Sequence, residues 1–239
     1  MRYIYGPVQS RRLGLSLGVS LTPHKVCDFD CLYCQLGRTT KLSGARDEYV
    51  KIADILEELK SWFLNNPEEA KALSYVTLAG SGEPTLNLRI GELISEIKKL
   101  APVKVAVITN ASLLNDFSVR NALLAADLIV PSLDAVVPEV FLALNRPSPD
   151  IKLEDIIAGL IALRREYRGQ IWLEVMLVKG VNDDIRYIKR LKEAVERINP
   201  DKIQLNSPVR STSENDVLPV NKAKLGKIKE LLGDKAEIV

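Results

Sequence analysis

The sequence predicts an α/β fold built on a parallel sheet, and three observations lead to this prediction. Six short, β-branched segments are almost continuously apolar, as strands buried on both faces of a sheet are. Segments with a helical spacing of apolar residues alternate with them. The chain has 239 residues, which suits one large domain. A partly closed barrel and a doubly wound sheet both fit, and both bind ligands at the carboxyl ends of their strands.

The elements follow one another in a regular order. The expected strands span residues 15–22, 75–79, 103–109, 128–132, 171–178 and 202–206. Helices are expected over residues 52–63, 88–100, 114–125, 137–144, 152–166, 185–198 and 221–232. Asn182 or Asp183 is expected to cap the N-terminus of the helix over 185–198. We expect a single domain with an N-terminal extension (1–14), a core (15–210), and a C-terminal helix and tail (211–239).

Composition and charge exclude several classes of protein. Apolar residues make up 46% and charged residues 27% of the chain, as in ordinary globular proteins. The net charge of +2 gives no sign of a polyanion-binding protein. No apolar run reaches the length of a membrane span, and the first residues lack the apolar core of a signal peptide. We therefore expect a cytoplasmic protein with no membrane partner.

Three cysteines form the most informative motif. Cys27, Cys31 and Cys34 are spaced C-x3-C-x2-C, and an odd, clustered set indicates metal binding rather than disulfides. Three thiolates can hold three corners of an iron–sulfur cluster and leave one iron open. The alternative is a Cys3His zinc site with His24, the only histidine. The partly apolar residues between the cysteines favour the cluster, and a cysteine nucleophile is disfavoured because only His24 could activate it.

The C-x3-C-x2-C spacing, with the aromatic Tyr33 before the last cysteine, resembles the radical S-adenosylmethionine (SAM) superfamily. The resemblance implies a partial (βα)6 TIM-like barrel. It implies that Cys27, Cys31 and Cys34 hold a [4Fe–4S] cluster whose open iron binds SAM, with Tyr33 beside the cofactors. The implied reaction is reductive cleavage of SAM to methionine and a 5′-deoxyadenosyl radical, which takes hydrogen from a substrate. An iron–sulfur oxidoreductase of this kind needs a ferredoxin- or flavodoxin-like one-electron donor.

A glycine-rich turn follows the second strand. Gly80, Ser81, Gly82 and Glu83 resemble the superfamily's glycine–glutamate motif, which hydrogen-bonds the amino group of SAM. Glycines let the backbone approach a ligand closely, and a carboxylate accepts hydrogen bonds from an ammonium group. The alternative is a tight βα turn in which Thr85 or Asn87 caps the next helix.

Polar side chains also follow the other strands. By the resemblance we expect these residues around SAM: Asn110, Ser112, Ser132, Asp134, Glu174, Gln204, Asn206 and Arg210. Structural roles are the alternative, with Asn110, Ser112 and Asp134 as caps and Glu174 paired with Lys179 or an adjacent backbone group. Arg210 suits an anionic group, either the SAM carboxylate or a substrate phosphate, or it stabilises its own loop.

Motifs along nearly the whole chain resemble one branch of the superfamily, the iron–sulfur oxidoreductases related to the wyosine tRNA-base-forming enzymes. Arg11 and Arg12 belong to one such motif and either close over the cluster, contact substrate or form a surface pair. The chain lacks cysteines for a second cluster, so a pyruvate-dependent tRNA reaction is not expected. Three hypotheses remain: a radical SAM enzyme acting on a small or nucleotide-like molecule, an activase or modifier of a protein or tRNA, and a zinc-stabilised binding module without a reaction.

Overall fold

The computed structural model describes residues 1–239 and contains one large, mostly parallel sheet. Its six central strands pair in chain order, and each is parallel to its neighbour. They are β2 (Gly14–Val19), β5 (Tyr75–Leu78), β6 (Lys104–Thr109), β7 (Leu128–Pro131), β8 (Gln170–Met176) and β9 (Lys202–Asn206). The predicted α/β fold with a partial barrel of six parallel strands is confirmed.

Two further strands extend the sheet at its edges. β1 (Ile4–Ser10) pairs antiparallel with β2, and β10 (Ala236–Ile238) pairs parallel with β9. The apolar pattern predicts neither strand, because Gly6 and Pro7 interrupt the first and the second has three residues. A separate ladder joins β3 (Val26–Cys27) to β4 (Lys41–Leu42), at the two ends of the cysteine loop.

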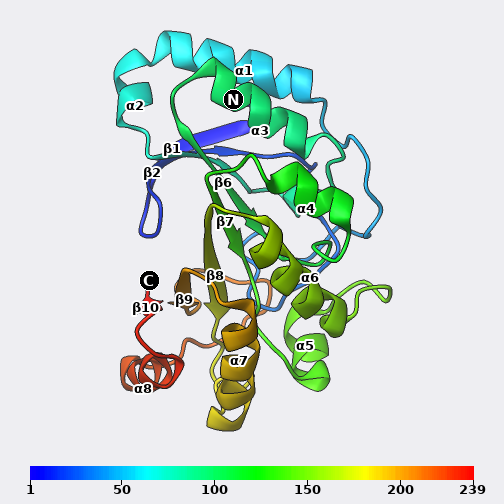
Figure 1. The fold of residues 1–239 in the computed structure, drawn as a ribbon, viewed down its shortest axis with the longest axis vertical. Coiled ribbons are helices and arrows are strands. Elements are labelled where there is room, and N and C mark those ends of the chain that lie inside the picture. The colour runs from blue at the N-terminus through cyan, green and yellow to red at the C-terminus, as the bar shows by residue number, and fades with distance from the viewer.

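Helices follow the strands and cover one face of the sheet, from α1 at the top of Figure 1 to α7 near the bottom. They are α1 (Ile52–Asn65), α2 (Pro67–Ala72), α3 (Ile90–Leu100), α4 (Phe117–Leu123), α5 (Pro138–Asn145), α6 (Leu153–Glu166), α7 (Ile185–Ile198) and α8 (Lys222–Leu232), with the 3-10 turn η1 (Pro84–Leu86). Seven correspond to predicted helices, and only the short α2 was not expected. None of the helices has both the length and the apolar character needed to cross a bilayer.

The predicted cap of α7 is wrong by one or two residues. Asp184 is the N-cap, and its side chain accepts a hydrogen bond from the backbone N–H of Arg186. Asn182 is buried and donates to the carbonyl oxygens of Asp134 and Met176. Asp183 accepts from the backbone N–H of Gly180, so both residues hold the β8–α7 loop instead of the helix.

The two faces of the sheet differ in chemistry. On the outer face, apolar residues such as Leu17, Val76 and Val107 pack against the helices in the main core. On the inner face, a smaller apolar cluster of Leu13, Ala106, Leu128 and Val130 is accompanied by polar side chains. Side chains alternate between faces along a strand, so the polar positions of β2, β5, β8 and β9 all face the barrel interior.

Candidate functional site

The cysteine loop connects β3 to β4 at the carboxyl edge of the sheet. Its three cysteines form no disulfide, and each is partly buried. Phe29 anchors the loop, because its ring meets the edge of Phe141 on α5 at a centroid distance of 5.6 Å. Tyr33 and its neighbour Leu32 pack against a small apolar cluster that includes Met176 at the end of β8. The loop is therefore fixed on apolar surface rather than held out in solvent.

Amide side chains from two other loops reach the cysteine sulfurs. Asn145 Nδ2 lies 3.5 Å from Cys31 Sγ, and Asn110 Nδ2 lies 3.8 Å from Cys27 Sγ. Burial, with nearby carboxylates, raises the pKa of the Cys27 thiol well above its ordinary value. Burial raises the pKa of Cys31 to about 12, with a contribution from Asp134. A bound metal reverses this preference, because a coordinating thiol loses its proton.

Asp28, next to the first cysteine, joins the loop to the end of β6. Its carboxylate is completely buried and accepts hydrogen bonds from Asn110 Nδ2 at 2.6 Å and from the Ser112 hydroxyl. Burial raises the pKa of Asp28, and these hydrogen bonds oppose the rise. Asn110 and Ser112, predicted to lie around SAM, are therefore brought to the site, where they hold the cysteine loop.

Asp134 plays the same part at the end of β7. Its buried carboxylate accepts hydrogen bonds from the Tyr33 hydroxyl, from Asn145 Nδ2 at 2.8 Å and from the backbone N–H of Met176 at 2.8 Å. Burial raises the pKa of Asp134 to about 6 despite these donors. Ser132 lies beside it, and its backbone N–H donates to Thr109 O at 2.9 Å. Tyr33, Asp134 and Asn145 thus form one hydrogen-bonded unit.

The glycine-rich loop packs directly on the start of the cysteine loop. A Cβ at Gly82 would lie 1.8 Å from Val26 O, so only glycine permits this contact. The backbone N–H of Lys25 donates to Ser81 O at 2.5 Å, and the N–H of Glu83 donates to Val26 O at 3.2 Å. The carbonyl oxygens of Gly80 and Gly82 accept no backbone hydrogen bond and remain available to a ligand.

Glu83 faces the interior of the protein rather than an open site. It is 2% exposed, and its carboxylate accepts from the Thr85 backbone and hydroxyl, the Thr109 hydroxyl and the Asn110 backbone at 2.6–3.0 Å. Burial, followed by the Asp28 charge, raises its pKa to about 7. Glu83 therefore fixes the loops after β5 and β6 relative to each other.

The inner face near β8 and β9 differs from the prediction in its ion pair. Glu174 pairs with Arg12 from the β1–β2 turn, not with Lys179, and accepts from Asn206 Nδ2 at 3.1 Å. Arg12 is remote in sequence, so spacing could not identify it. Gln204 donates to Glu237 on β10 at 3.0 Å, and its buried Oε1 has no partner.

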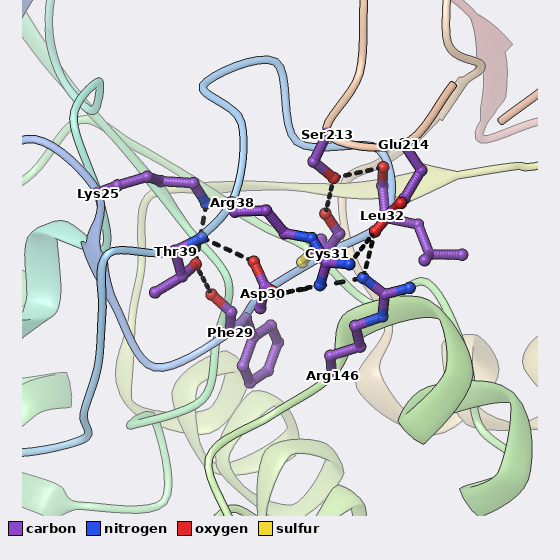
Figure 2. A network of polar contacts seen from close by, with 10 residues as sticks. All are labelled: Lys25, Phe29, Asp30, Cys31, Leu32, Arg38, Thr39, Arg146, Ser213 and Glu214. Carbon is purple, nitrogen blue, oxygen red and sulfur yellow. Dashed lines mark hydrogen bonds and ion pairs between the residues drawn. The ribbon is translucent and has the colours of Figure 1, made fainter. Parts of the chain in front are cut away.

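A charged network closes the outer side of the cysteine loop (Figure 2). Glu214 accepts from Arg38 and Arg146 at 2.6 Å each, and Arg38 also pairs with Asp30 at 2.8 Å. Ser213 Oγ lies within hydrogen-bond distance of the carbonyl oxygens of Cys31 and Leu32. The loop is thereby joined to the end of α5 and to the segment after β9.

Sequence reasoning missed Asn145, Asp28 and Ser213 as parts of the site. Asn145 ends a helix and Ser213 lies in a polar loop, and neither belongs to a motif. Asp28 carried a usable signal, because a carboxylate beside a cysteine in an apolar loop requires buried donors. Arg210, the last of the predicted site residues along the chain, is exposed and donates to Gln35 at 3.4 Å.

The donor set fits an iron–sulfur cluster. Three unpaired thiols, two amide donors to sulfur and apolar neighbours are the surroundings that such clusters require. No three His, Cys, Asp or Glu side chains converge on a point where one metal ion would bind. His24 is exposed and faces a separate cavity with Tyr49 and Asp54, so the Cys3His set is not assembled. An iron–sulfur cluster does not require its ligands to converge on a single metal ion, because each thiolate binds a different iron.

Relatives of known sequence cover most of the chain. It is 40% identical over 227 residues to a protein named GTPase Obg from Brachyspira hyodysenteriae, with 95% of this chain matched. The chain spans only 33% of the length of that protein. It is 39% identical over 208 residues to a UPF0026 protein of Synechocystis sp., with 87% of this chain and 76% of the relative covered.

Solved structures share the fold at low sequence identity. A radical SAM methyltransferase from Sphaerobacter thermophilus superposes with a TM-score of 0.71 and 15% identity, over 94% of this chain and 65% of that chain. Archaeal TYW1, a wyosine-forming enzyme, superposes with a TM-score of 0.62 and 20% identity, over 92% and 72%. The family model described as "Radical SAM superfamily" matches residues 21–194. The chain belongs to the radical SAM superfamily, and its cofactors are a [4Fe–4S] cluster and SAM.

Proposed function

We propose that this chain is a radical SAM enzyme in which Cys27, Cys31 and Cys34 hold the [4Fe–4S] cluster. When bound, the cofactors supply one-electron cleavage of SAM to methionine and a 5′-deoxyadenosyl radical, which takes a hydrogen atom from substrate and becomes 5′-deoxyadenosine. The observation that carries the proposal is the three unpaired, partly buried thiols on one loop, two of them facing amide donors. An external protein supplies the electron.

The surrounding residues orient the cofactors and exclude water. Asp28, Glu83 and Asp134 are positioning residues, because each is buried and saturated by donors from neighbouring loops. The free carbonyl oxygens of Gly80 and Gly82 suit the amino group of SAM, since an ammonium group needs acceptors. Ser132 follows β7 and Asn206 ends β9, so both lie at the carboxyl edge of the sheet, where we expect SAM to bind. Three unpaired cysteines suit a reducing compartment, so we propose the cytoplasm as its location.

Anaerobic reconstitution tests the proposal. Wild-type protein should bind about four irons, and dithionite with SAM should yield 5′-deoxyadenosine. Cys31→Ala should lose cluster absorbance and product. Ser61→Ala, which alters an exposed side chain on α1, is the control and should retain both. A colourless protein with one zinc, or a Cys31→Ala variant that still forms 5′-deoxyadenosine, would contradict the ligand assignment.

A further inference from the structure

A cavity of about 320 Å³ lies on the inner face of the sheet, against the turn between β1 and β2. Ser16, Thr77 and Ile108 line it from β2, β5 and β6, and Asn206 lines it from β9. Strands from both halves of the sheet therefore border one space. This space is the interior of the partial barrel, on the face that the main core does not occupy.

The charge of this cavity is one-sided. Arg11 and Arg12 from the β1–β2 turn and Arg210 after β9 line it, and no Asp or Glu does. Arg12 is engaged with Glu174, whereas Arg11 and Arg210 form no ion pair. In a chain whose net charge is only +2, two unneutralised guanidinium groups at one cavity are a local excess of positive charge.

The rest of the lining is polar and mostly neutral. The hydroxyl groups of Ser16 and Thr77 lie 2.5 Å apart and exchange a hydrogen bond, and Tyr5, Gln9 and Asn206 add further polar atoms. Although Ser16 and Thr77 satisfy each other, a lining rich in polar atoms favours a hydrophilic ligand, because an apolar ligand would remove the remaining polar groups from water. The volume is at the low end for ligand pockets, which favours a small molecule over a segment of a polymer.

The cavity also touches the cysteine loop. Gln35 directly follows Cys34 and lines the cavity, and Arg210 Nη1 donates to Gln35 Oε1 at 3.4 Å. A ligand whose anionic group contacts Arg11 and Arg210 therefore lies next to the proposed cluster site. Arg12 is held by Glu174, so the hairpin turn that carries Arg11 is tied to β8 across the barrel.

We propose that this cavity binds the substrate, a small molecule that carries a phosphate or carboxylate group, and that Arg11 and Arg210 bind that group. The proposal rests on the proposed function, because a substrate here is placed beside the source of the radical. Guanidinium groups suit the role because their planar donors pair with either anion through two parallel hydrogen bonds.

Calorimetric titration of the SAM-loaded holoenzyme tests the proposal, with inorganic phosphate and succinate as probes. We expect at least one probe to bind. The probe that binds more tightly identifies the anionic group of the substrate as a phosphate or a carboxylate. Arg11→Ala and Arg210→Ala should each weaken its binding by about tenfold or more, since each removes a charge-assisted hydrogen bond. Arg190→Ala is the matched control, because Arg190 is exposed on α7 and forms no ion pair. The proposal fails if neither probe binds up to about 10 mM, or if the two variants bind as the wild type does.

Two further measurements separate this proposal from its alternatives. If the probe binds only to holoenzyme that has not been loaded with SAM, and added SAM displaces it, the arginines hold the SAM carboxylate and the proposal is overturned. A tRNA or a protein could instead copurify with the wild type and not with Arg11→Ala, while neither probe binds. The substrate is then a macromolecule, and the proposal is again overturned. Formation of 5′-deoxyadenosine by the same wild-type preparation reports the proposed function independently, so either conclusion can fail alone.

Discussion

Neutral amide groups, rather than cations, face the sulfurs of the cysteine loop. Asn145 and Asn110 each donate toward one sulfur and toward one buried carboxylate, Asp134 and Asp28 respectively. An amide has two N–H donors, so a single side chain can serve both acceptors. A sulfur and a carboxylate are thereby held at a fixed spacing by one residue.

Asn145→Ala should therefore change two properties together. The reduction potential of the reconstituted cluster should fall, because an N–H donor to sulfur stabilises the more negative, reduced state more strongly. The free energy of unfolding should fall by about 1–3 kcal/mol, because buried Asp134 loses a donor. A redox titration followed by electron paramagnetic resonance and urea unfolding measure the two effects. Asn65→Ala, on the exposed end of α1, is the control. An unchanged potential would show that the Asn145 amide does not act on the cluster.

At the residue scale, the sequence predicts several residues that the structure brings together, but not their hydrogen-bond partners. Glycine and short polar side chains after a parallel strand are a local signal, and the structure brings Glu83, Asn110, Ser112 and Asp134 to the same edge of the sheet. Which donor meets which carboxylate depends on the path of the cysteine loop, which no spacing encodes. The ion pair of Glu174 with Arg12 spans 162 positions and was out of reach for the same reason.

At the scale of elements, the apolar pattern was reliable wherever a helix or strand packs on the core. It was less reliable at element ends, where side-chain hydrogen bonds decide the outcome. α7 shows this, because three consecutive polar residues precede it and only Asp184 has its carboxylate placed to accept from the helix backbone. The other two, Asn182 and Asp183, instead form hydrogen bonds that hold the β8–α7 loop.

The cap of α7 leads to a pH-dependent prediction. Hydrogen bonds from Arg186 lower the pKa of Asp184 to about 2, below the ordinary value near 3.8. Its charge therefore stabilises the folded state above pH ~4, and that stabilisation is lost as the pH falls toward 2. Asp184→Asn keeps the cap but removes the charge, so its melting temperature should lie below wild type at pH 7 and approach it as the pH falls. Thermal melts across this range measure the difference.

Two companion variants identify the capping residue. Asp184→Ala removes both the cap and the charge, so it should melt below Asp184→Asn at neutral pH. Asp150→Asn is the control, because Asp150 is exposed in the turn before α6 and forms no ion pair. If Asp184→Asn melts like the wild type at pH 7, or Asp184→Ala melts like Asp184→Asn, the assignment of the cap is incorrect.

At the scale of the whole molecule, the apolar core and the candidate site occupy different parts of the fold. The main core lies between the outer face and the helices, whereas the cysteine loop lies at the carboxyl edge. Figure 1 shows how the helices follow the sheet around that outer face. The order and direction of the six central strands follow from strand–helix alternation and right-handed crossovers, which is why the sequence predicts them. The edge strands depend on pairing alone and carry no such signal.

This separation predicts a local response to removal of iron. Chelation should speed hydrogen exchange in residues 28–40, because the buried thiols lose the metal that keeps them deprotonated. Strands β5 to β8 should stay protected, since their core does not include the cluster. Exchange of reconstituted and chelated protein, followed by mass spectrometry, compares the two regions. Equal loss of protection across the sheet would show that the cluster stabilises the whole fold.

The hairpin formed by β1 and β2 lines the cavity, whereas other segments of the chain supply the cofactor loops. Its turn supplies Arg11 and Arg12, and the Tyr5 ring occupies the space where a side chain at Gly18 would lie. The cysteines and the glycine-rich loop come from later segments of the chain. Substitutions in the first fourteen residues can therefore alter the shape and charge of the cavity while the cofactor loops keep their sequence. A lineage could thus acquire new substrates by changing its N-terminus and retain the same radical chemistry.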